Sequence, residues 1–157
     1  MNVARPELLW AEPLRKRSLM TIPATTLTQL VDAYLAALGS ADVDAVLALF
    51  TPDAIVSSPL YGEQPARDFY PTLFADTAAS VLTLRRTLVS TDDSAPTVAF
   101  WFDFDWTLSD GTPAPFSVVD VAELDLEARI QHLHIVYDTD PIRTAWEAQQ
   151  AGGNPRS

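Results

Sequence analysis

Residues 96–108 read Pro-Thr-Val-Ala-Phe-Trp-Phe-Asp-Phe-Asp-Trp-Thr-Leu, with a large apolar side chain at every second position. A period of two places alternate side chains on opposite faces of a strand, so this stretch predicts a long β-strand. Residues 80–90, 114–126 and 129–137 alternate in the same way, and polar turns such as Ser109–Thr112 separate the runs. The second half of the chain is therefore expected to form a meander of long antiparallel strands.

The first half of the chain has helical spacing instead. We expect helices over residues 25–38, 42–50 and 63–75, a short strand over 54–57 and a short helix after Pro141. Helices followed by an antiparallel meander are typical of an α+β fold. The expected architecture is a cone-shaped, curved antiparallel sheet with helices packed over its concave face. Such a half-open cone encloses a pocket between sheet and helices.

The composition excludes several classes of function. The chain has 157 residues, enough for one core, and no cysteine, so disulfides, thiolate metal sites and cysteine nucleophiles are excluded. Its net charge of −11 disfavours nucleic acid and anionic membrane surfaces as partners. A small domain without disulfides suits the cytoplasm, which is the expected compartment.

The domain is expected to span residues 25–150. Residues 1–24 carry a basic cluster and three prolines without a sustained period, which predicts a flexible N-terminal extension. Residues 151–157 are expected to form a disordered tail.

Several local patterns resemble one known family. They are Val31–Leu38 for a first helix, Ala45–Ser58 for a helix and strand, Gly62–Tyr70 for a third helix, and Val118–Val121 with Arg129–Gln131 for the last hairpin. In order and spacing they resemble the nuclear transport factor 2-like superfamily, which has a cystatin-like fold. Within it they are similar to the ketosteroid isomerases and the SnoaL-type polyketide cyclases.

The resemblance implies a pair of hydrogen-bond donors. In ketosteroid isomerases an aspartate base moves a proton between carbons, while a tyrosine and a protonated aspartic acid stabilise the enolate oxygen. By position, Tyr34 corresponds to the tyrosine, Asp120 to the aspartic acid and Tyr70 to a second tyrosine that bonds the first. Without the family, Asp120 in its apolar strand is either a neutral buried acid or an aspartate on the solvent face.

The resemblance also implies a substrate-binding set and a missing base. Leu133 and Tyr137 fall on pocket-lining positions, and Tyr61 lies in the turn beside the pocket. The position of the isomerase base holds Ser58, whose hydroxyl has no useful basicity near neutral pH without a neighbouring base. This departure argues against simple steroid isomerase activity.

Asp103 and Asp105 are the candidates to replace that base. They alternate with aromatic residues, so both lie on one face of their strand. That face is either the solvated side of the sheet or the lining of the cone, in which case either acid could act as the base. The turn at Asp110-Gly111 leaves a one-residue ambiguity of register, which would exchange the two faces.

His132 and His134 share the opposite face from the expected pocket residues of their strand. Two histidines at this spacing would bind a metal only if a third ligand converged on them. We expect a surface or dimer contact there, no metal site and no nucleotide cofactor.

Three functions are consistent with these residues. The first is an isomerase- or cyclase-type enzyme that stabilises the enolate of a hydrophobic ketone, steroid- or polyketide-like, through Tyr34 and Asp120. The second is a non-catalytic protein that binds hydrophobic small molecules and has lost the base. The third is an epoxide hydrolase or epoxide-opening cyclase, which would use Asp120 with Asp103 or Asp105 around one water. A homodimer through the outer face of the sheet is expected in each case.

Overall fold

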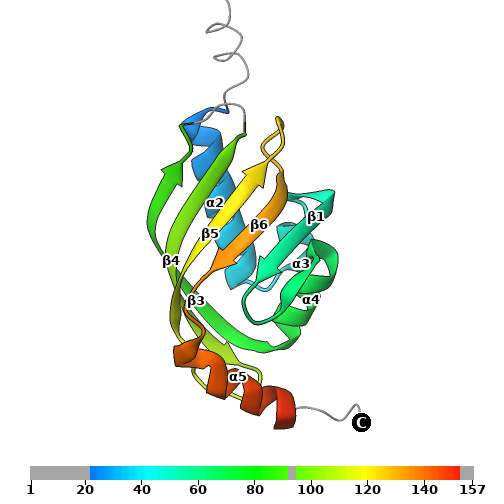
Figure 1. The fold of residues 1–157 in the computed structure, drawn as a ribbon, viewed down its shortest axis with the longest axis vertical. Coiled ribbons are helices and arrows are strands. Elements are labelled where there is room, and N and C mark those ends of the chain that lie inside the picture. The colour runs from blue at the N-terminus through cyan, green and yellow to red at the C-terminus, as the bar shows by residue number, and fades with distance from the viewer. Residues whose placement is uncertain (1–21, 92–94, 153–157) are drawn as a thin grey trace, which may run out of the picture.

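The computed structural model describes residues 22–91 and 95–152 (Figure 1). In chain order the elements are α2 (Ala24–Gly39), α3 (Val43–Leu47), β1 (Phe50–Ser58), β2 (Gly62–Pro65), α4 (Ala66–Ala75), β3 (Thr77–Val89), β4 (Thr97–Leu108), β5 (Phe116–Leu124), β6 (Ile130–Val136) and α5 (Asp140–Gly152). The α+β class is confirmed. Residues 1–21 and 153–157, most of the expected extension and tail, lie outside the described residues, and α5 continues two residues into the range expected to be tail.

The six strands form one curved sheet in the order β2-β1-β6-β5-β4-β3. Strands β3 to β6 pair with their neighbours in antiparallel fashion, as the meander predicts. One pairing departs from the expected antiparallel sheet, because β1 runs parallel to β6. These two strands are not joined by a hairpin: β6 returns beside β1 only after the whole meander, so no tight turn dictates their direction.

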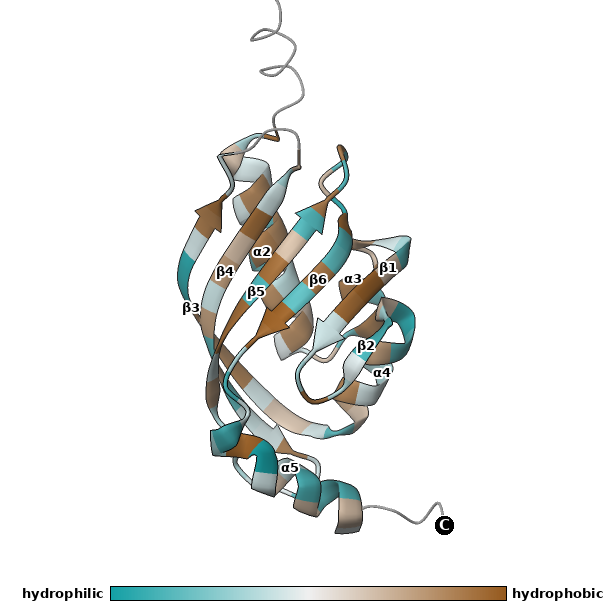
Figure 2. Cartoon of the chain, viewed as in Figure 1, coloured by the Kyte–Doolittle hydropathy of each residue, from teal (hydrophilic) through white to brown (hydrophobic). Residues whose placement is uncertain are grey.

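Alternation along the strands decides which side chains face the helices. On β4 the even-numbered residues from Val98 to Leu108 are buried, and the odd-numbered ones are exposed or half-buried. On β5 burial alternates in the same way from Val118 to Leu124, although Figure 2 shows that polar and apolar residues do not alternate strictly along this strand. The inward side chains form one core with the apolar stripes of α2 and α4, so the helices cover the concave face of the sheet.

The first strand begins earlier than its sequence indicates. Strand β1 starts at Phe50 and contains Pro52, which was expected to break a helix ending near residue 50. Pro52 is tolerated because the pairing of β1 with β6 shifts register between Phe50 and Ile55. The helix expected over residues 63–75 is also shorter than the sequence indicates. Residues Gly62–Pro65 pair with β1 as strand β2, so α4 starts only after Pro65.

Helix α5 is longer than the short helix expected after Pro141. It lies across one end of the sheet (Figure 1), with Ile142 buried and Ala145 and Trp146 packed against the core. None of the helices in the described ranges is long and apolar enough to cross a membrane.

Candidate active site

A pocket lies between the concave face of the sheet and helices α2 and α4. Its empty volume is about 430 Å³, a figure that includes a part open to solvent. The apolar wall consists of Leu38, Phe69, Leu73, Phe102, Phe104, Trp106, Phe116, Val118 and Ile135. The polar groups that interrupt this wall come from Tyr34, Ser58, Tyr61, Asp120 and Tyr137.

Tyr34, Tyr70 and Asp120 form a buried polar cluster beside the pocket. The hydroxyl oxygens of Tyr34 and Tyr70 lie 3.0 Å apart, and the Tyr34 hydroxyl also hydrogen-bonds Asp120. Burial, and then the neighbouring polar groups, hold the pKa of Tyr34 well above its usual value, so its hydroxyl keeps its proton. Tyr70, which we also expected among the substrate-binding residues, does not line the pocket; it bonds Tyr34 from behind, as the resemblance implies.

Asp120 is the one acidic residue among the described residues that line the pocket. It is 1% exposed and pairs with Phe100 in the β4–β5 register, which places it on the inner face and excludes the solvent-face alternative. Burial raises the pKa of Asp120 to about 8, and the hydrogen bond from Tyr34 lowers it in part. Its Oδ1 atom has no hydrogen-bond partner among the described residues. A carboxyl with this pKa is mostly protonated at neutral pH and can donate a hydrogen bond to a ligand.

Ser58 and Tyr137 meet at another part of the wall. The Ser58 hydroxyl accepts a hydrogen bond from the Tyr61 backbone at 3.3 Å, and Ser58 also hydrogen-bonds Tyr137. Burial raises the pKa of Tyr137 to about 12. Ser58 lines the pocket, as expected, and its hydrogen-bond partners among the described residues include no carboxylate that could make it basic.

Tyr61 connects the pocket to helix α5. Its hydroxyl donates to Asp76 Oδ2 at 2.7 Å and accepts from Trp146 Nε1 at 3.2 Å, and the Tyr61 and Trp146 rings meet edge to face. Gln150 also donates to Asp76, which is the C-cap of α4. Sequence reasoning missed Trp146 and Asp76, because contacts between residues this far apart in the chain leave no local pattern.

Leu133 is corrected from a substrate-binding residue to a core residue. It faces inward, as the parity of β6 predicts, but it is fully buried and does not line the pocket. It pairs with Val56 on β1 and Ala122 on β5, and these small neighbours close the core around it.

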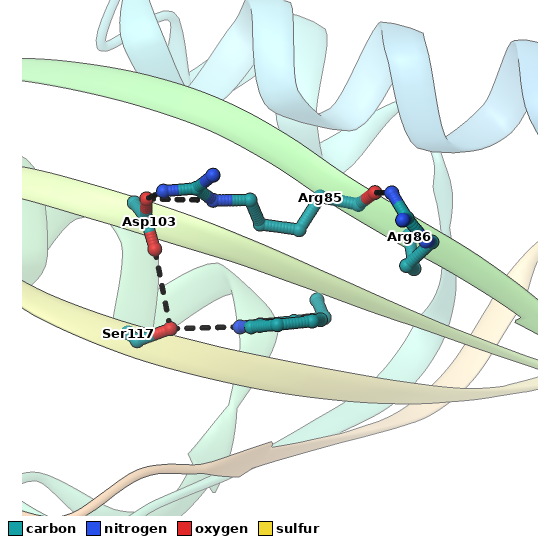
Figure 3. Close-up of polar contacts among 5 residues, drawn as sticks. Arg85, Arg86, Asp103 and Ser117 are labelled. Atoms are coloured by element: carbon teal, nitrogen blue, oxygen red, sulfur yellow. Dashed lines mark hydrogen bonds and ion pairs between the residues drawn. The ribbon is translucent and has the colours of Figure 1, made fainter.

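Asp103 and Asp105 lie on the outer face of the sheet, so neither can supply the base of this pocket. Arg85 crosses from β3 to bond Asp103, with its Nε atom 2.8 Å from Oδ2, and Ser117 donates to Oδ1 at 3.2 Å (Figure 3). The hydrogen bond from Arg85 lowers the pKa of Asp103, which keeps the carboxylate ionised in solvent. Asp105 is exposed on the same face.

The histidines also lie on the outer face, as expected, and a third candidate ligand joins them. Glu123 Oε2 lies 2.9 Å from His134 Nε2 and 3.8 Å from His132 Nδ1. The same face exposes the apolar side chains of Val81, Trp101 and Val136, and the homodimer through this face stays a prediction.

The half-open α+β cone encloses an otherwise apolar pocket that contains one buried acid, three tyrosines and one serine. The SnoaL-like domain family matches residues 31–133, more than half of the chain, and the chain belongs to this family. The resemblance drawn from the sequence is thereby confirmed. No curated protein matches the chain in sequence.

Solved structures share the fold at low sequence identity. TerC, co-crystallised with polyporic acid, is 16% identical, with a TM-score of 0.65 over 78% of this chain and 98% of its own. SalBIII, an epoxide hydrolase/cyclase-like enzyme of pyran ring formation in the polyether salinomycin, is 18% identical, with a TM-score of 0.62 over 71% and 89%. An NTF2-like protein from Exiguobacterium sp. 255-15 is 19% identical, with a TM-score of 0.59 over 69% and 98%. At these identities the likeness establishes the fold alone.

Proposed function

We propose that this protein is a small-molecule enzyme of the isomerase or cyclase type, acting on a hydrophobic ketone. In this account the ketone oxygen lies between Tyr34 and Asp120. The Tyr34 hydroxyl turns its one proton from Asp120 to this oxygen, and protonated Asp120 donates its own, as the enolate forms. The observation that carries the proposal is the buried Asp120 carboxyl, which lines an apolar pocket and whose Oδ1 atom has no hydrogen-bond partner in the part of the chain that the structure describes. Preorganised donors in a site of low dielectric stabilise developing negative charge strongly.

The absence of a second carboxyl from the described pocket wall narrows the reaction. Ser58 occupies the position of the isomerase base, and Asp103 and Asp105 face solvent on the other side of the sheet. Donors without a strong base suit a carbon acid that is already activated, such as a carbon between two carbonyl groups. Such a carbon is acidic enough for solvent water in the open part of the pocket to accept its proton, while Tyr34 and Asp120 stabilise the enolate that is left. This argument favours cyclase chemistry on a polyketide-like substrate over steroid isomerisation.

The epoxide alternative loses the second acid on which it depends. It requires two carboxyl groups around one water, and the described part of the chain brings only Asp120 to the pocket. The non-catalytic binding protein remains the competing function, because it needs the pocket and the donors but no proton transfer.

Proton exchange separates an enzyme from a binding protein. A hydrophobic cyclic 1,3-diketone serves as the probe, and NMR follows deuterium entering the carbon between its carbonyl groups. We expect the wild-type protein to accelerate exchange and Asp120→Leu and Tyr34→Phe to remove most of the acceleration. If wild type binds the probe but exchanges its carbon-bound proton no faster than Asp120→Leu does, the protein is a binding protein and not an enzyme.

A further inference from the structure

Glu123, His132 and His134 form a compact cluster on the outer face of the sheet. Their ligand atoms all lie within 4.8 Å of one another. Strand pairing positions these residues. Glu123 on β5 pairs directly with His132 on β6, and His134 lies two residues further along the same face. Three potential ligands are therefore positioned by two hydrogen-bonded strands rather than by a loop, which favours a precise site.

We propose that this cluster binds a divalent transition-metal ion of the Zn²⁺ type through His132 Nδ1, His134 Nε2 and a Glu123 carboxylate oxygen. Two imidazoles and one carboxylate are a common ligand set for zinc, and three protein ligands leave a position open for water or another ligand. The side chains are partly exposed, at 29% for His132, 41% for His134 and 53% for Glu123, so an ion can enter from solvent.

The surroundings of His132 support this choice of atoms. Its Nε2 atom lies 2.8 Å from the Ser57 hydroxyl, which in turn donates to Glu63 Oε2 at 3.3 Å. If Nε2 carries the proton and donates to Ser57, Nδ1 is left unprotonated and free to bind the ion. A metal-bound histidine typically has such an outer hydrogen bond, which fixes its tautomer and orientation.

Metal binding requires a small local change. The two imidazole rings stack nearly in parallel, with centroids 3.9 Å apart and planes 17° apart. Because a metal ion lies in the plane of the ring that binds it, the rings must tilt toward the ion, and their partial exposure leaves room for this. The site lies on the opposite face of the sheet from the pocket, so it is separate from the proposed enzyme site.

Calorimetric titration of the untagged full-length chain with Zn²⁺ alone tests the proposal, followed by visible absorption with Co²⁺, whose spectrum reports coordination geometry. We expect one ion per chain. His132→Gln and His134→Gln should each weaken binding by more than the roughly 10–100-fold that loss of an outer partner typically costs. Ser57→Ala should weaken binding about tenfold, and Ser57→Thr, which keeps the hydroxyl, should restore it.

Two controls make the outcome decisive. Asp105→Asn removes an exposed acid of the same face outside the cluster, and it should leave Zn²⁺ affinity unchanged. Circular dichroism of the metal-free variants should match the wild type, because all the substituted side chains are partly exposed. The proposal is overturned if wild type takes up no Zn²⁺, or if wild type and the double histidine variant bind it equally.

Discussion

Tyr34 on α2 hydrogen-bonds Asp120 on β5, and it does so inside an apolar pocket where the carboxyl has its pKa raised to about 8. The Tyr70 hydroxyl, 3.0 Å from that of Tyr34, orients the tyrosine from the far side. The chain thus holds one neutral acid and one phenol at the same place in the cone.

Stability should depend on pH through Asp120. Its pKa rises from 3.8 to about 8 on folding, so the folded chain binds more protons than the unfolded chain between these values. The stability contributed by the neutral acid is therefore complete below about pH 4 and is lost as pH rises toward 8. Asp120→Asn cannot ionise. As the pH rises from about 5 to about 9, the free energy of unfolding of this variant should therefore fall by on the order of a few kcal/mol less than that of wild type. Urea unfolding at about pH 5 and about pH 9 measures the difference. Parallel losses in the two proteins would mean that ionised Asp120 is solvated in the folded state.

Tyr34→Phe should destabilise the chain and disturb Asp120 together. The substitution leaves the buried Tyr70 hydroxyl without its partner, which costs about 1–3 kcal/mol. It also removes the hydrogen bond that lowers the pKa of Asp120, so that pKa should rise further. Carbon-13 NMR of labelled aspartate measures the titration. Tyr70→Phe is the matched control, with a similar loss of stability and a smaller effect on Asp120. A larger effect from Tyr70→Phe would contradict the assigned order of the three groups.

Ser58→Asp should supply the base that the pocket lacks. A positioned acid–base group contributes about 10²–10⁴-fold to proton transfer. The variant should accelerate allylic proton transfer on a β,γ-unsaturated ketone by a factor in that range, whereas wild type should be nearly inactive on it. The carboxylate enters an apolar pocket, so the variant should also lose stability. Fast turnover by wild type would reveal another base.

Trp146→Ala should loosen the pocket from a distance. Trp146 packs edge to face on Tyr61 and donates a hydrogen bond to its hydroxyl, so it holds a pocket residue in place from α5. The loss of stability should be about 1–2 kcal/mol, with weaker ligand binding. Trp146→Phe keeps the ring contact and should recover most of both. A variant that melts earlier but binds ligand normally would confine Trp146 to a structural role.

The sequence predicts which residues of a central strand share a face, but not which of the two faces is turned toward the helices. The period of two separates Phe102 and Phe104 from Asp103 and Asp105, but alternation alone cannot tell which set faces the helices. Packing decides it, because Phe102 and Phe104 are buried in the core with the helices, whereas Asp103 pairs with Ser117 on the outer face. Asp120 and Tyr34 could be assigned in advance only through the family resemblance, because each is also compatible with an ordinary structural role.

Contacts between distant parts of the chain could not be predicted. The parallel pairing of β1 with β6 and the contact of Trp146 with Tyr61 join segments that share no local pattern. Pro52 indicates a break in the chain, yet it lies inside β1 at a shift of register, which only the three-dimensional pairing shows.

The affinity of the pocket for a hydrophobic phenol, a mimic of the enolate, tests the central claim most directly. A hydrogen bond to a charged group is worth about 1.5–3 kcal/mol, so Asp120→Leu should bind the phenolate roughly 10–100-fold more weakly than wild type. Asp120→Asn can still donate through its amide and should keep part of the affinity. Equal affinities in wild type and both variants would place Asp120 outside the binding site and contradict the account.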